Sequence, residues 1–162
     1  MFIRFKDFIL RIMHILIIIY LLVFVPIFWG WYPLVVISGS MEPTLNVGGL
    51  LYYHEYKIED FKEDDILVYQ TPTNIISHRI VEVTDDGFIT KGDANNTNDS
   101  KLINKNILGI GTQWCIPFLG YYADFIYHHK WILFVSVAIL LIDLLNELYR
   151  NRQEKRRSVK NE

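Results

Sequence analysis

Hydrophobic residues gather near both ends of this 162-residue chain, and a longer, more polar segment separates them. Residues 12–30 contain no Lys, Arg, Asp or Glu. A helix of about 20 apolar residues crosses the ~30 Å hydrocarbon core of a bilayer, so this run is long enough to span a membrane. It exceeds the apolar core of about 7–15 residues in a cleaved secretion signal, and no small-residue cleavage site follows it. The pattern therefore predicts an uncleaved transmembrane anchor within residues 1–31.

The second apolar run covers residues 131–145. Because this run is short for a full crossing, we extend the predicted transmembrane helix to residues 127–149, and an interfacial helix is the alternative. Asp143 falls within this helix, and a carboxylate at the middle of a bilayer costs several kcal/mol. We therefore expect Asp143 near the inner end, where it can reach lipid headgroups or pair with the basic tail.

Basic residues set the predicted orientation. Arg4, Lys6 and Arg11 flank the first apolar run, and residues 150–162 form a basic tail after the second. Since Lys and Arg are enriched on the cytoplasmic side, both ends should lie inside and residues 32–126 outside. We expect a multi-pass protein of a plasma membrane or an ER-like membrane, with the tail touching anionic lipid. The formal net charge of −2 gives no reason to expect a nucleic-acid partner.

The segment between the two apolar runs has the composition of short strands joined by polar turns. Its predicted strands, rich in β-branched and aromatic residues, are 47–53, 65–69, 75–84, 88–91 and 107–111. Asp86-Gly87 is a hairpin turn signal, residues 72–74 mark another connection, and residues 57–65 read as a solvated loop or a single helical turn. The predicted fold class is mainly β, a small barrel or coiled sheet flanked by N- and C-terminal transmembrane helices.

Three polar clusters in this segment contain residue types that catalysis uses. In the first, Ser38 and Ser40 surround Gly39, which allows a tight bend that exposes a hydroxyl and a backbone N–H together. In the second, His78 offers a base that is substantially neutral near pH 7, as a serine nucleophile requires. The third cluster, residues 91–100, could supply a carboxylate that orients the imidazole. Taken singly, each also reads as ordinary structure: a polar turn, a packing histidine and a solvated loop.

The residue types that bind metals are too sparse to predict a metal site. Cys115 is the single cysteine, so it cannot form an intrachain disulfide, and no paired Cys/His spacing suggests zinc. We therefore predict no metal and no cofactor.

Taken together, the three clusters resemble the boxes of type I signal peptidases, specifically the archaeal and eukaryotic-ER branch. SGSMEPTL at residues 38–45 is similar to the nucleophile box, and KGDANNTND at residues 91–99 to the third box. SHRIV at residues 77–81 has a histidine where the bacterial branch has a lysine base. The resemblance extends over residues 36–111, and residues 116–120 also fit.

Two departures from the family pattern concern turns. Family members commonly carry Gly-Asp where this chain has Gly48-Gly49, and Gly where it has Asp64. We assign no chemistry to either position, so the departures bear on local turn geometry.

The resemblance implies a serine-peptidase mechanism with named residues. His78 would take the proton of Ser40 as its hydroxyl attacks the scissile carbonyl, giving an acyl-enzyme that water hydrolyses. The Ser40 N–H and the Ser38 hydroxyl would stabilise the oxyanion. Asp99, which matches the family's second acid, is preferred as the orienting carboxylate, and Asp93 is the alternative.

The resemblance also implies the partners. The substrates would be secretory preproteins with small residues before the cleavage site, bound as an extended strand along a sheet edge. Membrane lipid would surround the anchors, and the secretion translocon is a candidate partner. Two rival readings are a self-cleaving or regulatory serine peptidase and a membrane-tethered binding protein without activity.

Overall fold

The computed structural model describes residues 2–160, which form two compact units. One unit consists of residues 2–21 together with 126–160, and the other of residues 22–125. Met1 and residues 161–162, the outermost parts of the predicted cytoplasmic stub and tail, lie outside the described residues.

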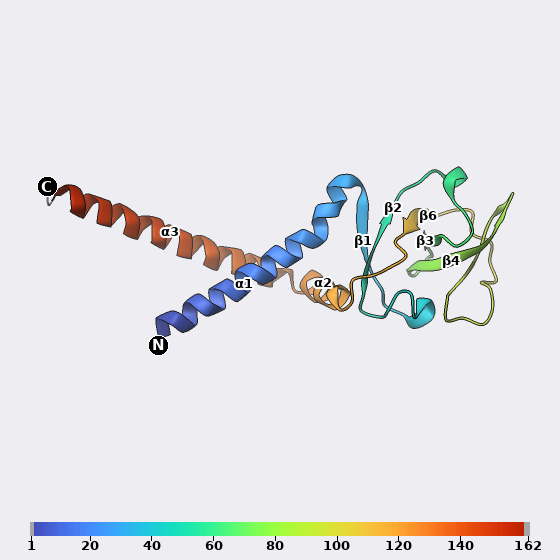
Figure 1. Ribbon diagram of the computed structural model, residues 1–162, viewed down its shortest axis with the longest axis horizontal. Coiled ribbons are helices and arrows are strands. Elements are labelled where there is room, and N and C mark those ends of the chain that lie inside the picture. The colour runs from blue at the N-terminus through green and yellow to red at the C-terminus, as the bar shows by residue number, and fades with distance from the viewer. Residues whose placement is uncertain (1, 161–162) are drawn as a thin grey trace. The chain divides into compact units, whose positions relative to one another are not determined.

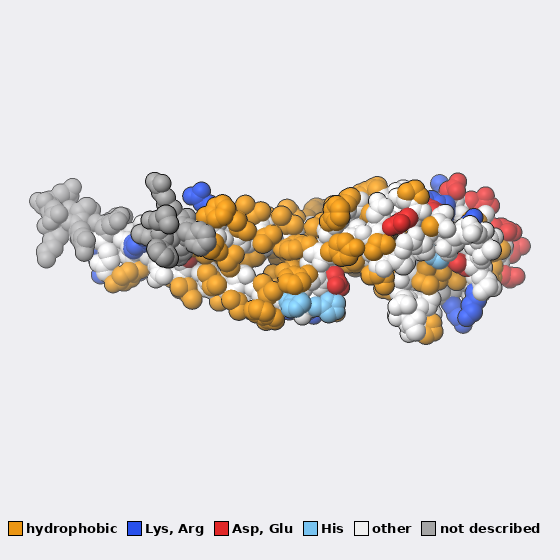
Figure 2. Space-filling model, turned by 90° about the horizontal axis from the view of Figure 1, so that it is seen from below, with side chains coloured by type: hydrophobic (Ala, Val, Ile, Leu, Met, Phe, Trp, Pro, Cys, Tyr) orange, Lys and Arg blue, Asp and Glu red, His pale blue; other side chains and the backbone are white. Residues whose placement is uncertain are grey.

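Two long apolar helices belong to the terminal segments of the chain (Figure 1). Helix α1 covers Phe2–Phe24 and helix α3 covers Lys130–Lys160. By length and composition, Phe8–Trp29 and Lys130–Gln153 could each cross a membrane. Hydrophobic side chains cover much of the surface of these helices (Figure 2). Such surface is costly in water and neutral in lipid, so it suits the predicted flanking transmembrane helices.

The second candidate span begins later than the sequence predicted. Residues 127 and 128 belong to a separate helix, α2, which covers Leu119–His128. The long helix starts at Lys130, directly before the apolar run, and its candidate span continues to Gln153 instead of ending at residue 149. The apolar run alone could not reveal α2, because the two helices follow each other almost without a break.

The first apolar run ends in a turn that leads straight into the sheet. Pro26 has no N–H to continue α-helical hydrogen bonding, and the chain continues as a 3-10 turn, Val25–Trp29. Gly30 closes this turn with a left-handed backbone at φ 79°. The next residues form strand β1, Trp31–Val35. The sequence analysis missed this strand because aromatic residues after an apolar run are also typical of a membrane interface.

Residues 22–125 are built around a six-stranded antiparallel sheet with the order β1-β2-β6-β3-β4-β5 (Figure 1). The remaining strands are β2 (Leu50–His54), β3 (Ile66–Gln70), β4 (Ile75–Thr84), β5 (Gly87–Lys91) and β6 (Ile107–Gly111). The last strand, β6, lies between β2 and β3. The mainly-β fold class with flanking apolar helices is therefore confirmed.

All five predicted strands are present, and three of them differ from the predicted bounds by one to three residues. The bounds of β4 and β6 agree fully. Strand β2 begins at Leu50 instead of residue 47, since Gly48 adopts a left-handed φ of 77° that a strand does not allow. The hairpin turn lies at Asp85-Asp86, one residue earlier than predicted, and Gly87 starts β5. Residues 57–65 contain a single helical turn, as predicted.

Strand β3 is buried on both faces and joins two hydrophobic clusters. Successive side chains of a strand point to opposite faces. Ile66 and Val68 accordingly pack into one cluster, and Leu67 and Tyr69 into the other. The first cluster also contains Met41, which immediately follows Ser40. The core of the sheet thus reaches directly beneath the segment that the sequence analysis singled out.

Gly109 should be the most sensitive glycine of β6. It has φ 149°, and a Cβ at this position would overlap the backbone carbonyl of His54. We expect Gly109→Ala to lower the free energy of unfolding by at least about 2 kcal/mol, because neither strand can shift without losing ladder hydrogen bonds.

Gly111→Ala in the same strand is the matched control. Its Cβ would meet only side-chain atoms, at 3.3 Å, so its loss should be smaller. Urea unfolding of both variants in detergent micelles measures the difference, and equal losses would contradict the proposed clash.

Candidate active site

Ser40 lies in a short turn anchored by buried neighbours. Gly39–Met41 forms a 3-10 turn directly after the extended residue Ser38. Met41 is 1% exposed and Leu45 is fully buried, so the segment is fixed to the core on the C-terminal side of Ser40. The carbonyl of Ser40 accepts a hydrogen bond of 2.9 Å from the N–H of Ala94. The serine turn is therefore tied both to the core and to the loop that follows β5.

His78 lies on β4, opposite Leu67 of the doubly buried strand β3, and its side chain contacts two candidate residues. Its Nε2 lies 3.1 Å from the Ser40 hydroxyl oxygen, and its Nδ1 lies 2.7 Å from Oδ2 of Asp99. An imidazole that donates Nδ1–H to a carboxylate keeps Nε2 as an acceptor. In this tautomer, the geometry allows the Ser40 hydroxyl to donate to His78.

Asp99 is held in place from strand β5. Its N–H donates to the carbonyl of Thr90 at 2.8 Å, and the Thr90 hydroxyl donates to its Oδ2 at 2.6 Å. The sequence analysis missed Thr90, although its position two residues after Phe88 in a strand places both side chains on one face. Phe88 and Thr90 are both buried. A polar residue on the inward face of a predicted strand was the sequence signal that could have identified Thr90.

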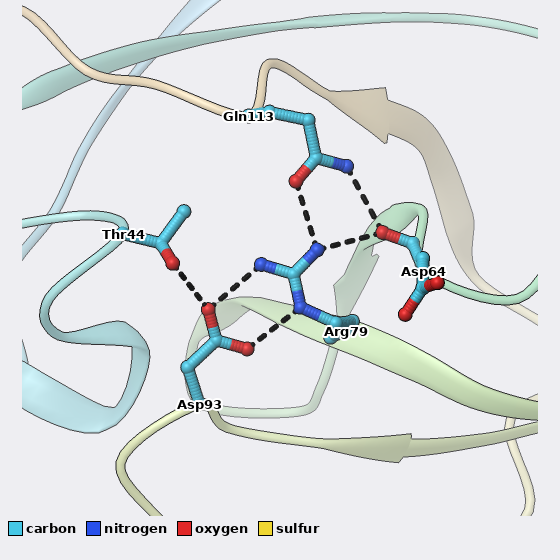
Figure 3. Close-up of polar contacts among 5 residues, drawn as sticks. All are labelled: Thr44, Asp64, Arg79, Asp93 and Gln113. Carbon is cyan, nitrogen blue, oxygen red and sulfur yellow. Dashed lines mark hydrogen bonds and ion pairs between the residues drawn. The ribbon is translucent and has the colours of Figure 1, made fainter.

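Asp93 makes different contacts from Asp99 (Figure 3). Arg79 donates from Nε to Oδ1 at 2.8 Å and from Nη2 to Oδ2 at 2.7 Å. The Thr44 hydroxyl donates to the same Oδ2 at 2.6 Å. Of the two acids that the sequence left open, the structure brings Asp99 into contact with His78, whereas Asp93 pairs with the neighbouring arginine. Both oxygens of Asp93 are occupied by these donors.

These contacts shift the titration of Asp93. The hydrogen bonds from Arg79 lower the pKa of this carboxyl below its ordinary value, burial opposes the shift, and the hydrogen bond from Thr44 adds to the lowering. The carboxylate in turn raises the pKa of Arg79. The pair is therefore ionised throughout the neutral range, and it is shielded, with 21% and 14% of the two side chains exposed.

Arg79 extends this network to two further segments (Figure 3). Its Nη1 donates to the carbonyl of Asp64 at 2.7 Å and to Oε1 of Gln113 at 2.8 Å. The Gln113 side chain also donates to the Asp64 carbonyl, at 2.9 Å. Asp64 has φ 73°, the left-handed conformation that glycine favours, which fits the glycine commonly found there in the family that the sequence resembles. Sequence patterns gave no signal for Gln113, which lies beyond β6.

Ser38 lies beside the Ser40 hydroxyl. The two side-chain oxygens are 3.3 Å apart, and both residues border an open cleft of about 310 Å³. The cleft is lined by residues 34–38, 40, 41 and 74–78.

Among the described residues, no group of three or more His, Cys, Asp or Glu could hold a metal ion.

Comparison with known proteins assigns the chain to a family. The sequence profile of the family described as signal peptidase, peptidase S26, matches residues 8–113. The chain belongs to the signal peptidase family. It is a signal peptidase I-type peptidase, and the matched region contains all five sequence-predicted site residues.

Relatives from fungi and bacteria are similar over much of the chain. The signal peptidase complex catalytic subunit SEC11 of Fusarium vanettenii is 30% identical over 65% of this chain and 70% of its own length. The corresponding subunit of Colletotrichum graminicola is 32% identical with the same coverage. Signal peptidase I W of Bacillus subtilis is 32% identical over 57% of this chain and 52% of its own length.

The Asp93 ion pair should stabilise the fold in a pH-dependent way. Its native pKa lies below the unfolded value of about 3.9, so its contribution is complete well above that pH and is lost as pH falls through the native pKa. We expect Asp93→Asn to reduce the free energy of unfolding at pH 7 by about 2–3 kcal/mol.

The difference between wild type and Asp93→Asn should shrink as the pH drops below about 4, because the carboxyl then binds protons more readily in the unfolded wild type than in the native protein. Unfolding measured between pH 7 and pH 3 tests this. A difference that stays constant over the whole range would rule out the ion pair as its source.

Proposed function

We propose that this peptidase removes signal peptides from secretory preproteins, with Ser40 as nucleophile, His78 as general base and Asp99 as the orienting carboxylate. The observation that carries the proposal is the position of His78, whose two ring nitrogens lie within hydrogen-bonding distance of the other two side chains. A nucleophile next to a base that a third group orients is the arrangement that acyl transfer requires.

The mechanism has two halves that use the same groups. His78 accepts the proton of Ser40 as its Oγ attacks the scissile carbonyl, and Asp99 stabilises the imidazolium that forms. The imidazolium then protonates the leaving amine as the peptide bond breaks, which leaves the signal peptide esterified to Ser40. Water, deprotonated by His78, attacks the ester and restores the serine hydroxyl.

The oxyanion of each tetrahedral intermediate would lie next to Ser38. The hydroxyl of Ser38 is already 3.3 Å from the attacking oxygen, and the backbone N–H of Ser40 is the second proposed donor. Donors fixed beside the developing charge stabilise it without reorganising during the reaction.

The cleft supports binding of the preprotein as an extended strand. One wall is formed by residues 34–38, which include the end of the edge strand β1. The other wall is formed by residues 74–78, where β4 pairs with β3 on one side and its pairing with β5 begins only at Arg79. An extended peptide could therefore hydrogen-bond to strand edges on both sides.

Side chains in the cleft favour small substrate residues before the cleavage site. Val36 and Met41 are buried wall residues, and Ile76 is partly buried on the opposite wall. These apolar wall residues support a preference for small apolar substrate side chains close to Ser40.

We further propose the membrane arrangement that the sequence predicted. Residues 1–31 would contain the anchor, 32–126 the extracytoplasmic catalytic domain, 127–149 the second transmembrane helix and 150–162 the cytoplasmic tail. The two apolar helices support this arrangement, and the histidine base and the SEC11 relatives support the archaeal and ER branch. Membrane lipid and the secretion translocon are the proposed partners besides the substrate.

Replacing the three proposed catalytic residues should abolish processing. We expect Ser40→Ala and His78→Ala to lower kcat for a model preprotein by at least about 10³-fold. Asp99→Asn should lower kcat by about 10²–10⁴-fold, because the amide no longer selects the working tautomer of His78. Cleavage in proteoliposomes, followed by gel electrophoresis of precursor and product, measures these effects.

Asp93→Asn is the matched control for Asp99→Asn, since both remove one carboxylate from the same loop. Its effect on kcat should be smaller, because both ring nitrogens of His78 are bonded to other residues, Asp99 and Ser40. Full activity of Ser40→Ala would refute the serine mechanism, and a larger loss in Asp93→Asn would reverse the assignment of the orienting acid.

Ser38→Ala should slow the reaction without weakening substrate binding. The hydroxyl would act on the charge that develops after binding, so kcat should fall by about 10²–10³-fold while KM stays near the wild-type value. Ser77→Ala, another cleft-lining serine, is the control and should leave kcat largely unchanged. A loss confined to KM would show that Ser38 binds substrate instead.

A further inference from the structure

The carboxylate oxygen of Asp99 that faces His78 has a second, buried donor. Oδ2 accepts from His78 Nδ1 at 2.7 Å and from the Thr90 hydroxyl at 2.6 Å. The two donors differ in their surroundings, because Thr90 is fully buried whereas 11% of the His78 side chain is exposed. A short hydrogen bond to an ionised acceptor in a buried setting is a strong one.

The position of Thr90 is fixed by the sheet. Its Cα is paired with Ile80 of β4, two residues beyond His78, and its carbonyl accepts the N–H of Asp99. A threonine side chain has few χ1 rotamers, so a fixed backbone also fixes its hydroxyl. Thr90 therefore holds Asp99 at two points, one on the backbone and one on the side chain.

Tyr69 of β3 completes the buried side of this contact. Burial raises the pKa of its phenol, a hydrogen bond with Thr90 lowers it, and the charge of Asp99 and a hydrogen bond with it raise it. The phenol thus stays protonated at neutral pH and lies close to both residues. Tyr69 is 5% exposed and belongs to the hydrophobic cluster that also contains Ile80 of β4 and Phe88 of β5.

We propose that Thr90 is a positioning residue of the peptidase, whose hydroxyl fixes the Asp99 carboxylate so that Oδ2 points at His78 Nδ1. The proposal rests on the catalytic roles proposed above. The terminal torsion of an aspartate is broad, so a carboxylate bonded to His78 alone could rotate and turn the imidazole away from Ser40. Loss of this alignment slows the chemical step, because the base must lie within hydrogen-bonding reach of the serine proton.

The expected signature is a loss in kcat that depends on the hydroxyl. Thr90 does not line the cleft, so its replacement should leave KM near the wild-type value. Thr90→Val keeps the shape of the side chain and removes the donor, and we expect kcat to fall about 10- to 100-fold. Thr90→Ser keeps the donor and removes a methyl group, and it should retain kcat within about threefold of wild type.

Thr84→Val is the matched control for the loss of a threonine hydroxyl. Thr84 lies in the same hairpin, and its hydroxyl donates to the carbonyl of Gly87 at 2.8 Å. This bond is at the turn end of the hairpin, and Gly87 is not part of the proposed triad. The four proteins, wild type included, are compared in proteoliposomes for kcat and KM on a model preprotein and for thermal unfolding. Ser40→Ala is measured beside them.

The outcomes separate the two proposals. Wild-type kcat in Thr90→Val, with Ser40→Ala inactive, would overturn the role of Thr90 and leave the serine mechanism standing. Equal kcat losses in Thr90→Val and Thr90→Ser would also overturn it, because packing and not the hydroxyl would then be responsible. Activity in Ser40→Ala would refute the proposed mechanism itself, and the role of Thr90 with it.

Discussion

The ion pair between Arg79 and Asp93 lies where the parts of the candidate site meet. Arg79 follows His78 on β4, Asp93 belongs to the loop that also carries Asp99, and Thr44 belongs to the segment after Ser40. Charge-assisted bonds in a shielded place are worth more than exposed ion pairs, and here three of them converge on one carboxylate. This pair therefore links the segments that carry Ser40, His78 and Asp99.

The two acids of the loop have different partners, because both oxygens of Asp93 already accept hydrogen bonds. Asp93 uses both oxygens for Arg79 and Thr44, so it has no short bond left to offer an imidazole. Asp99 presents Oδ2 to His78 because its N–H is bonded to the carbonyl of Thr90, which extends the β5 backbone geometry to the acid. Six positions of sequence separate these carboxylates, and backbone hydrogen bonding places Asp99 next to His78.

The sequence predicted the features that have local signals. Apolar runs predicted the flanking helices, and stretches rich in β-branched and aromatic residues predicted five of the six strands. The serine, histidine and acid boxes predicted residues that the structure brings together. The position of β6 between β2 and β3 results from pairing between segments far apart in the chain, and no local pattern of residues in the sequence indicates such a pairing. The choice between Asp99 and Asp93, and the roles of Thr44 and Gln113, likewise depend on contacts between distant segments.

The bond from the Ala94 N–H to the Ser40 carbonyl joins two loops that lie outside the strands. Loops with few ladder hydrogen bonds open at a lower free-energy cost than the core strands of the same fold. An opening that breaks this bond together with the bond from Thr44 to Asp93 would release the serine turn and the acid loop from each other while the doubly buried β3 stays in place. On warming, such a protein would lose its proteolytic competence as a local event, before any cooperative melting of the sheet.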